Sequence, residues 1–390
     1  MASCLFPTGF LSVFHGLFVL GTIFLFLSNK FPKLKSGNAE NFFFAFFLWL
    51  LGTELLKPGM FDYLISFRAL FEYRYILITA MVMFVFKSDQ RLLKIGIWGL
   101  LIGTVINVVG SYLLAMGVIS WRGAEYSFSN HIFHGFAVSV AAIGLYTLSI
   151  KSKNFSHQVA YFSFATFALI HVMFIEDGRT GFILATLVSG CFLLFSLVFL
   201  KRSRLILLIL FLAVCFFFLT NREVIGLFED LEIFLNGDYK QIANKSNLAR
   251  IDFFITPLSS FKGSTLFGFG LSEVPIFYAN LFQQNILLSL TDNPHSEIIN
   301  VFFASGLGGV SLMYLAFLYP LFRVMTFGIK SNRNELIFLG FTLMLFFIVS
   351  SFGNAILKDY GEKNLLLIIY TLVGQINWSR KENWNQKFEN

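Results

Sequence analysis

Long apolar segments recur along almost the whole chain, and this feature constrains the fold most strongly. The 390 residues are 56% hydrophobic and only 13% charged, whereas soluble domains carry roughly 25% charged residues. The apolar segments have about 16–24 residues, the length that an α-helix needs to cross roughly 30 Å of hydrocarbon. The sequence therefore predicts an all-α fold, a polytopic bundle of about 11–12 transmembrane helices.

The predicted spans fall into two groups that a long polar stretch separates. Residues 1–220 form the N-terminal bundle with about eight spans, residues 221–294 form a loop domain, residues 295–379 hold about three spans, and residues 380–390 form a tail. The third span could begin earlier, within Met60–Tyr75. The spans are expected near residues 9–27, 41–56, 73–86, 95–118, 133–150, 158–175, 180–200, 204–220, 295–322, 336–354 and 364–378.

The distribution of Lys and Arg predicts the orientation. Alternate connections and the tail hold 17 basic and five acidic residues, a charge of +12, while the remaining 12 basic and 17 acidic residues give −5. Since cytoplasmic loops of membrane proteins are enriched in Lys and Arg, the first set should be cytoplasmic. Residues 221–294 should then lie outside the cytoplasm and the tail inside. The net charge of +7 reflects topology, and a nucleic-acid partner is not implied.

The large loop is the one predicted extramembrane segment long enough to fold. Gly226–Leu235 and Asn247–Phe261 mix apolar and charged residues at helical spacing. Two short amphipathic helices that lie along the membrane face are therefore expected. They would form a lid or platform over a cavity between the spans.

Cationic side chains stand near the predicted external ends of the spans. Arg179 follows Glu176 and Asp177 in a short external turn, and at a helix start its guanidinium could bind phosphate through paired hydrogen bonds. An interfacial arginine that pairs with these acids is the alternative. Arg250 and Lys262 lie in the large loop, where a solvated charge is the competing interpretation.

A glycine-rich run, residues 263–270, follows Lys262. It lacks the G-x-x-x-x-G-K-[ST] pattern of a phosphate-binding P-loop. We interpret it as a turn that leads the chain back to the membrane.

A polar cluster opens the span that follows the large loop. Asn293 can cap this helix with Pro294 at its first position. His295 would then lie in the first helical turn, at the external end of the span, which we call the mouth. The helix dipole disfavours the imidazolium form there. Such a neutral histidine could accept a proton, and a structural histidine at the headgroup level is the alternative.

Other classes of function fit the sequence poorly. Charged residues inside the spans are scarce, which argues against an ion-coupled transporter and against a flippase with a polar path. No Asp-x-Asp pair is present for a metal-bound nucleotide sugar, and the three cysteines, Cys4, Cys191 and Cys215, form no metal-binding pattern. No cofactor and no metal site are predicted.

The spacing of these residues resembles a known family. His295-Ser296, nine further residues and then Gly306-x-x-Gly309 are similar to the H-[NSQ]-x9-G-x-x-G signature of bacterial O-antigen ligases, whose superfamily also holds O-antigen polymerases. Arg179-Thr180-Gly181 at the outer end of a middle span and Arg250 in the loop extend the resemblance. It covers residues of about 170–320, while the first 150 residues match only in hydropathy.

The resemblance implies a glycosyltransferase of the bacterial inner membrane with its active site facing the periplasm. The enzyme would take a glycan from undecaprenyl diphosphate and transfer it to the lipid A core. Membrane lipids would surround it. His295 would be the base, Arg179 and Arg250 would stabilise the diphosphate, and Lys262 and Ser296 would contact substrate. Direct attack without a metal would invert the sugar carbon. A polymerase with the same donor is the alternative.

Overall fold

The computed structural model describes residues 39–57, 63–85, 90–120, 131–175, 179–199, 222–237, 245–261, 263–291, 294–359, 361–370 and 372–374. Within these ranges the chain is helical, and its one β-type contact is an isolated bridge between Ser264 and Gly268. The predicted all-α polytopic class is therefore confirmed. The helices are α2 (Ala39–Leu55), α3 (Tyr63–Glu72), α4 (Arg74–Val85), α5 (Gln90–Ala115), α6 (His131–Lys151), α7 (Phe155–Phe174), α8 (Arg179–Phe199), α10 (Arg222–Leu235), α11 (Lys245–Ser260), α12 (Glu273–Gln283), α13 (Glu297–Lys330) and α14 (Asn334–Gly353), with a further helix over residues 361–370.

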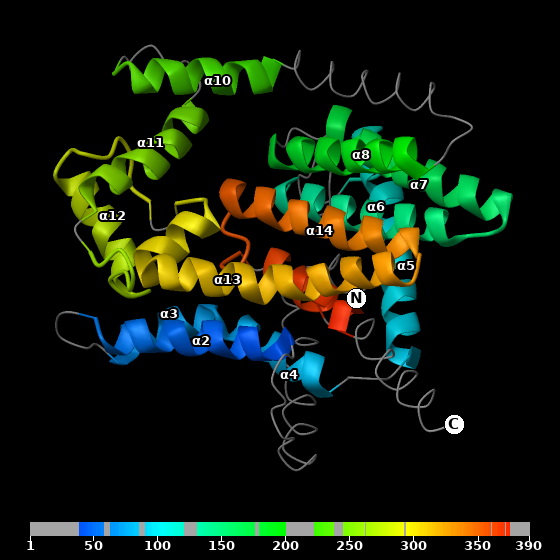
Figure 1. Cartoon of the computed structure of the whole chain (residues 1–390). Helices are drawn as coiled ribbons and strands as arrows, with labels where there is room; N and C mark the ends of the chain where they lie inside the picture. Colours follow the sequence, from blue (N-terminus) through cyan, green and yellow to red (C-terminus); the bar gives the residue numbers. More distant parts are fainter. Residues whose placement is uncertain are drawn as a thin grey trace, which may run out of the picture.

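The long helix α13 lies at the centre of the bundle (Figure 1). It packs against α2 on one side and α14 on the other, and α14 in turn packs against α6 and α8. The loop helices α11 and α12 gather at the end of the bundle where α13 begins and α14 ends (Figure 1). The start of α13 therefore lies beside the loop domain.

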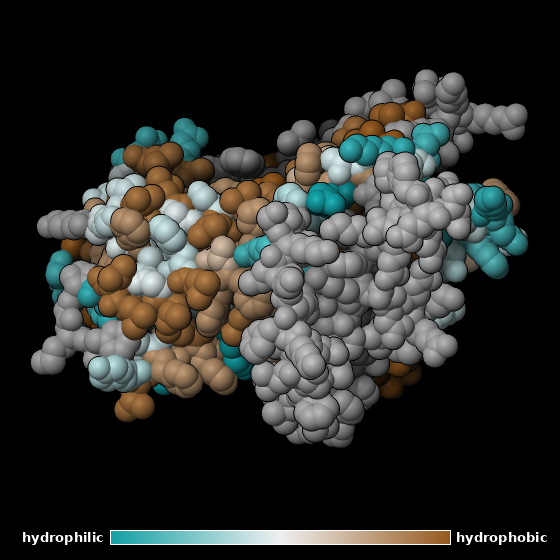
Figure 2. Space-filling model, turned by 60° about the horizontal axis from the view of Figure 1, so that its bottom comes forward, coloured by the Kyte–Doolittle hydropathy of each residue, from teal (hydrophilic) through white to brown (hydrophobic). Residues whose placement is uncertain are grey.

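Five of the described helices, α6, α7, α8, α13 and α14, are long and apolar enough to cross a membrane. Apolar side chains also cover much of the face that α2 and α3 present (Figure 2), among them the exposed residues Leu48, Leu64, Phe67 and Phe71. Large exposed apolar patches are unusual on soluble proteins and are normal on a surface that faces lipid. The exterior therefore fits the membrane interpretation.

Most predicted spans that the structure describes coincide with helices. The spans near 41–56, 73–86 and 95–118 correspond to α2, α4 and α5, and the amphipathic segments of the large loop are confirmed as α10 and α11. The short α3 before α4 and the loop helix α12 were not predicted as separate helices. The expected spans near 9–27 and 204–220, and the tail, lie outside the described residues.

Helix α13 is broken at Gly306, whose φ of 65° and ψ of −167° are not helical. The glycine-rich run docks against this break. The N–H of Leu307 donates to the carbonyl of Thr265 at 2.8 Å, and the N–H of Phe269 donates to the carbonyl of Phe303 at 2.9 Å. Backbone groups that the break frees inside an apolar bundle thus find partners, as burial requires. The run is therefore more than the connecting turn that we predicted.

Gly306 should be the least replaceable glycine of this contact. A Cβ at this position would lie 2.2 Å from the carbonyl carbon of Leu266, and the positive φ already disfavours other residues. We expect Gly306→Ala to lower the free energy of unfolding by more than about 1 kcal/mol. Gly144→Ala is the matched control, because a Cβ there meets nothing within 4 Å inside α6. Thermal unfolding of both purified variants in detergent tests this, and equal melting temperatures would contradict it.

Candidate active site

His295 lies immediately before α13 and is exposed. The helix begins at Glu297 with Ser296 as its N-cap, so the prediction that His295 occupies the first helical turn is wrong. The predicted cap, Asn293, lies outside the described residues. His295 instead has a φ of 52°, in the left-handed region, which projects it from a tight turn at the mouth. The dipole argument for a neutral ring in a first helical turn therefore falls away, although histidine remains the side chain best suited to exchange a proton near pH 7.

The ring of His295 stacks on Phe253 of α11, with 6.4 Å between the ring centroids and 28° between the planes. Arg250 precedes Phe253 by three residues on the same helix, and residues at this spacing share a helix face. The contact therefore places His295 against the helix that carries Arg250, although the two residues lie 45 positions apart in the chain.

Buried polar contacts hold α11 in this position. Asp252 accepts hydrogen bonds from the hydroxyl of Thr256 at 2.6 Å and from the N–H of Leu288 at 2.9 Å. Tyr278 of α12 donates its hydroxyl proton to the carbonyl of Phe253 at 2.9 Å. Leu288 belongs to the segment that leads to His295, so Asp252 joins the two parts of the mouth. The sequence did not mark Asp252, because its partner lies 36 residues away.

Arg179 and Arg250 lie close enough for their charges to interact. Burial, and then the positive charge of Arg179, hold the pKa of the Arg250 guanidinium below its ordinary value. Arg179 is the first residue of α8, as predicted. Within the described part of the chain, Arg250 forms no ion pair with a carboxylate. Two positive charges that interact repel each other, and an anion bound between them would relieve this repulsion.

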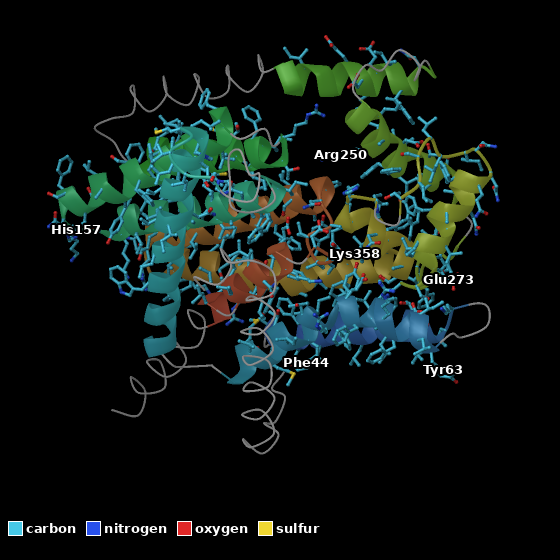
Figure 3. The ribbon with its side chains drawn as sticks, turned by 180° about the vertical axis from the view of Figure 1, so that it is seen from behind. Phe44, Tyr63, His157, Arg250, Glu273 and Lys358 are labelled. Carbon is cyan, nitrogen blue, oxygen red and sulfur yellow. The ribbon has the colours of Figure 1, made fainter. Side chains whose placement is uncertain are left out.

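The start of α8 is fixed by close packing against α6. A Cβ on Gly135 would lie 2.4 Å from the Cα of Gly181, so the two helices touch backbone to backbone here. Gly181 follows Arg179 by two residues, and this contact therefore sets where the Arg179 side chain begins. Figure 3 shows that Arg250 and Lys358 lie far from His157, which is at the opposite end of the bundle. Lys358 lies in the turn after α14.

The remaining predicted substrate contacts have different outcomes. Lys262 lies outside the described residues. Ser296 is buried, and its hydroxyl donates to the carbonyl of Ser351 at 3.3 Å. This hydrogen bond holds the turn, and the contact between Ser296 and substrate stays a prediction.

The glycine-rich run does not form a cradle for phosphate. The N–H groups of Gly268, Phe269 and Gly270 donate to the carbonyls of Ser264, Phe303 and Ala304, respectively. These three N–H groups are thus occupied within the run and by its contact with α13, and they are not available to a phosphate.

A hollow of about 700 Å³ beside the glycine-rich run is lined mainly by apolar residues, including Trp49 and Phe267. The cation in its lining, Lys57, lies 3.1 Å from a carboxylate oxygen of Glu54 and 3.3 Å from one of Glu273. Its charge is therefore balanced, in contrast to that of Arg250. Arg250 is therefore a better candidate than Lys57 for binding an anion.

Comparison with known families identifies the segment that carries these residues. Residues 164–314 match the family model described as O-antigen ligase. Over this segment the chain is similar to O-antigen ligases. The predicted resemblance to O-antigen ligases is thus confirmed, and the matched segment contains Arg179, Arg250, His295 and Gly306. No curated protein matches the chain significantly.

The matched segment carries two kinds of group that are relevant to glycan transfer. A pair of arginines can stabilise negative charge on a phosphorylated leaving group. The exposed His295, whose ring stacks on the helix that carries Arg250, could take a proton from an attacking hydroxyl. Within the described residues, no cluster of three or more His, Cys, Asp and Glu side chains could hold a metal ion. These groups are compatible with the lipid-linked glycan substrates that the O-antigen ligase family implies.

Proposed function

We propose that the chain is an O-antigen ligase, a glycosyltransferase that moves a polysaccharide from undecaprenyl diphosphate to the lipid A core. The observation that carries this proposal is the pair formed by Arg179 and Arg250, beside the helix whose Phe253 stacks on His295. A diphosphate supplies the negative charge that two neighbouring guanidiniums favour.

In the proposed transfer reaction, each of these residues has a distinct role. The bond between the sugar carbon and the diphosphate oxygen breaks, and the oxygen leaves with the diphosphate, whose charge the arginines stabilise. The acceptor hydroxyl oxygen bonds to the same carbon from the opposite face and gives its proton to His295. A single displacement of this kind inverts the sugar carbon. The donor is already activated, so neither ATP nor a nucleotide sugar is consumed.

The proposed setting is the bacterial inner membrane, with the mouth facing the periplasm. The charge division of +12 against −5 supports this orientation. The large loop carries α10, α11 and α12, and it would cover the mouth on the periplasmic side. Membrane lipids would surround the apolar helices, and the donor would approach from them.

A gene deletion distinguishes the ligase from a polymerase that uses the same donor. Gel analysis of lipopolysaccharide from the deletion strain should show core without O-antigen, together with polymer that is still linked to its lipid carrier. Core that carries a single repeat unit would contradict the ligase assignment and indicate the polymerase. Re-expression of the intact chain is the control, because it should restore polymer on the core.

A further inference from the structure

The turn that presents His295 is held by its two following residues. A left-handed backbone conformation costs a residue other than glycine roughly 1–2 kcal/mol, so it persists only where the surroundings enforce it. The N–H of Glu297 donates to the carbonyl of Asn354 at 3.0 Å. With the bond from Ser296 to Ser351, this contact ties the turn to the end of α14.

The Glu297 side chain adds a second set of ties. It is fully buried, and one carboxylate oxygen accepts a hydrogen bond from the Tyr73 hydroxyl at 2.9 Å. The other oxygen accepts one from the N–H of Leu357 at 2.8 Å. Tyr73 in turn accepts a hydrogen bond from the side-chain amide of Asn300, one turn further along α13. A buried carboxyl group needs such partners, because burial without them is costly.

These bonds join three separate parts of the chain. Tyr73 lies between α3 and α4, Glu297 begins α13, and Leu357 lies in the turn after α14. The network therefore fixes the start of α13 from two sides, two residues from the proposed base. Lys358, which directly follows Leu357, also interacts with the Glu297 charge.

We infer that Glu297 and Tyr73 are positioning residues for the transfer reaction, which hold the His295 turn in the orientation that proton transfer requires. The inference rests on the proposed function, because it assigns these residues an effect through His295. Neither side chain is assigned a contact with substrate. A displacement of about 1 Å of a reacting group can cost roughly a hundredfold in rate, so loosening this network should act on turnover.

The principal test is Tyr73→Phe in the full-length protein, purified and reconstituted in liposomes. This change removes the hydroxyl that bonds to Glu297 and Asn300 but keeps the ring. We expect kcat to fall about tenfold or more while KM for the lipid-linked donor stays nearly unchanged. Glu297→Gln, which retains an acceptor for Leu357, should lose less activity than Glu297→Ala.

The matched control is Tyr370→Phe. The Tyr370 hydroxyl is also buried, and it donates to the carbonyl of Phe317 at 2.7 Å. Its removal should cost similar stability and leave kcat as it is. Equal kcat values for Tyr73→Phe and Tyr370→Phe would overturn the inference, as would a change of KM alone.

A parallel assay of His295→Ala separates this inference from the proposed function. Loss of transfer in His295→Ala with full turnover in Tyr73→Phe and Glu297→Gln would overturn only the positioning role. Full transfer by His295→Ala would overturn the proposed base and the positioning role with it. If Tyr73→Phe does not fold, the kcat values of Glu297→Gln and Glu297→Ala are compared instead. Equal kcat values for these two variants would overturn the inference.

Discussion

Arg250→Lys should lower the rate of glycan transfer by roughly a hundredfold, and Arg179→Lys should do the same. Lysine keeps the positive charge but cannot reproduce the paired hydrogen bonds of a guanidinium. Loss of one group that stabilises developing charge typically costs about 3 kcal/mol, or roughly a hundredfold in rate. Initial rates with a purified lipid-linked donor measure the effect.

Arg323→Lys is the matched control for both changes. Arg323 lies on α13 far from its start, and its guanidinium donates to the Tyr319 hydroxyl. This variant should transfer glycan at the parent rate. Because the two site arginines would contact one diphosphate, the double variant should lose less activity than the product of the two single losses. Full activity in both single variants would show that these residues are interfacial anchors.

His295→Ala should lower transfer by a factor of roughly 10² to 10⁴, the usual contribution of a positioned general base. The expected loss lies in kcat, since the acceptor hydroxyl then gives its proton to water. His157→Ala is the matched control, because His157 lies on α7 at the opposite end of the bundle (Figure 3). Near-normal transfer by a correctly folded His295→Ala protein would reduce His295 to a structural residue.

The transfer reaction should also survive EDTA. The proposed stabilisation of the diphosphate comes from Arg179 and Arg250, so no divalent cation is needed at the leaving group. Transfer rates before and after dialysis against EDTA test this expectation. A loss that Mg²⁺ or Mn²⁺ restores would contradict it.

The local sequence was sufficient to predict features that depend on composition and on the spacing of residues. The apolar spans predicted α6, α8 and α14 closely, and Arg179 stands at the start of its helix as expected. The helices α10 and α11 also followed from helical spacing in the loop. Each of these features depends on residues that are near neighbours in the chain.

The start of α13 could not be predicted in this way. Asn293 and Pro294 form a good local cap signal, yet the helix begins at Glu297. The partners that hold this start are Tyr73, Asn354 and Leu357. The nearest of them is 57 residues from Glu297 in the chain, so no local pattern contains them.

The break at Gly306 was hidden for the same reason. The sequence predicted one span over residues 295–322, and the structure instead inserts the glycine-rich run against a non-helical backbone within it. Each of the two segments in this contact contains glycines, which the sequence shows. Only the fold brings Gly268 to within van der Waals reach of α13.

We propose that two arginines and a histidine serve one reaction at one mouth. Donor binding and transfer measured on the same preparations test this proposal most directly. Arg250→Lys should weaken both the binding of the lipid-linked diphosphate donor and its transfer. His295→Ala should bind the donor as tightly as the parent protein and fail to transfer it. Transfer by His295→Ala at the parent rate, or unweakened donor binding by Arg250→Lys, would contradict the claim.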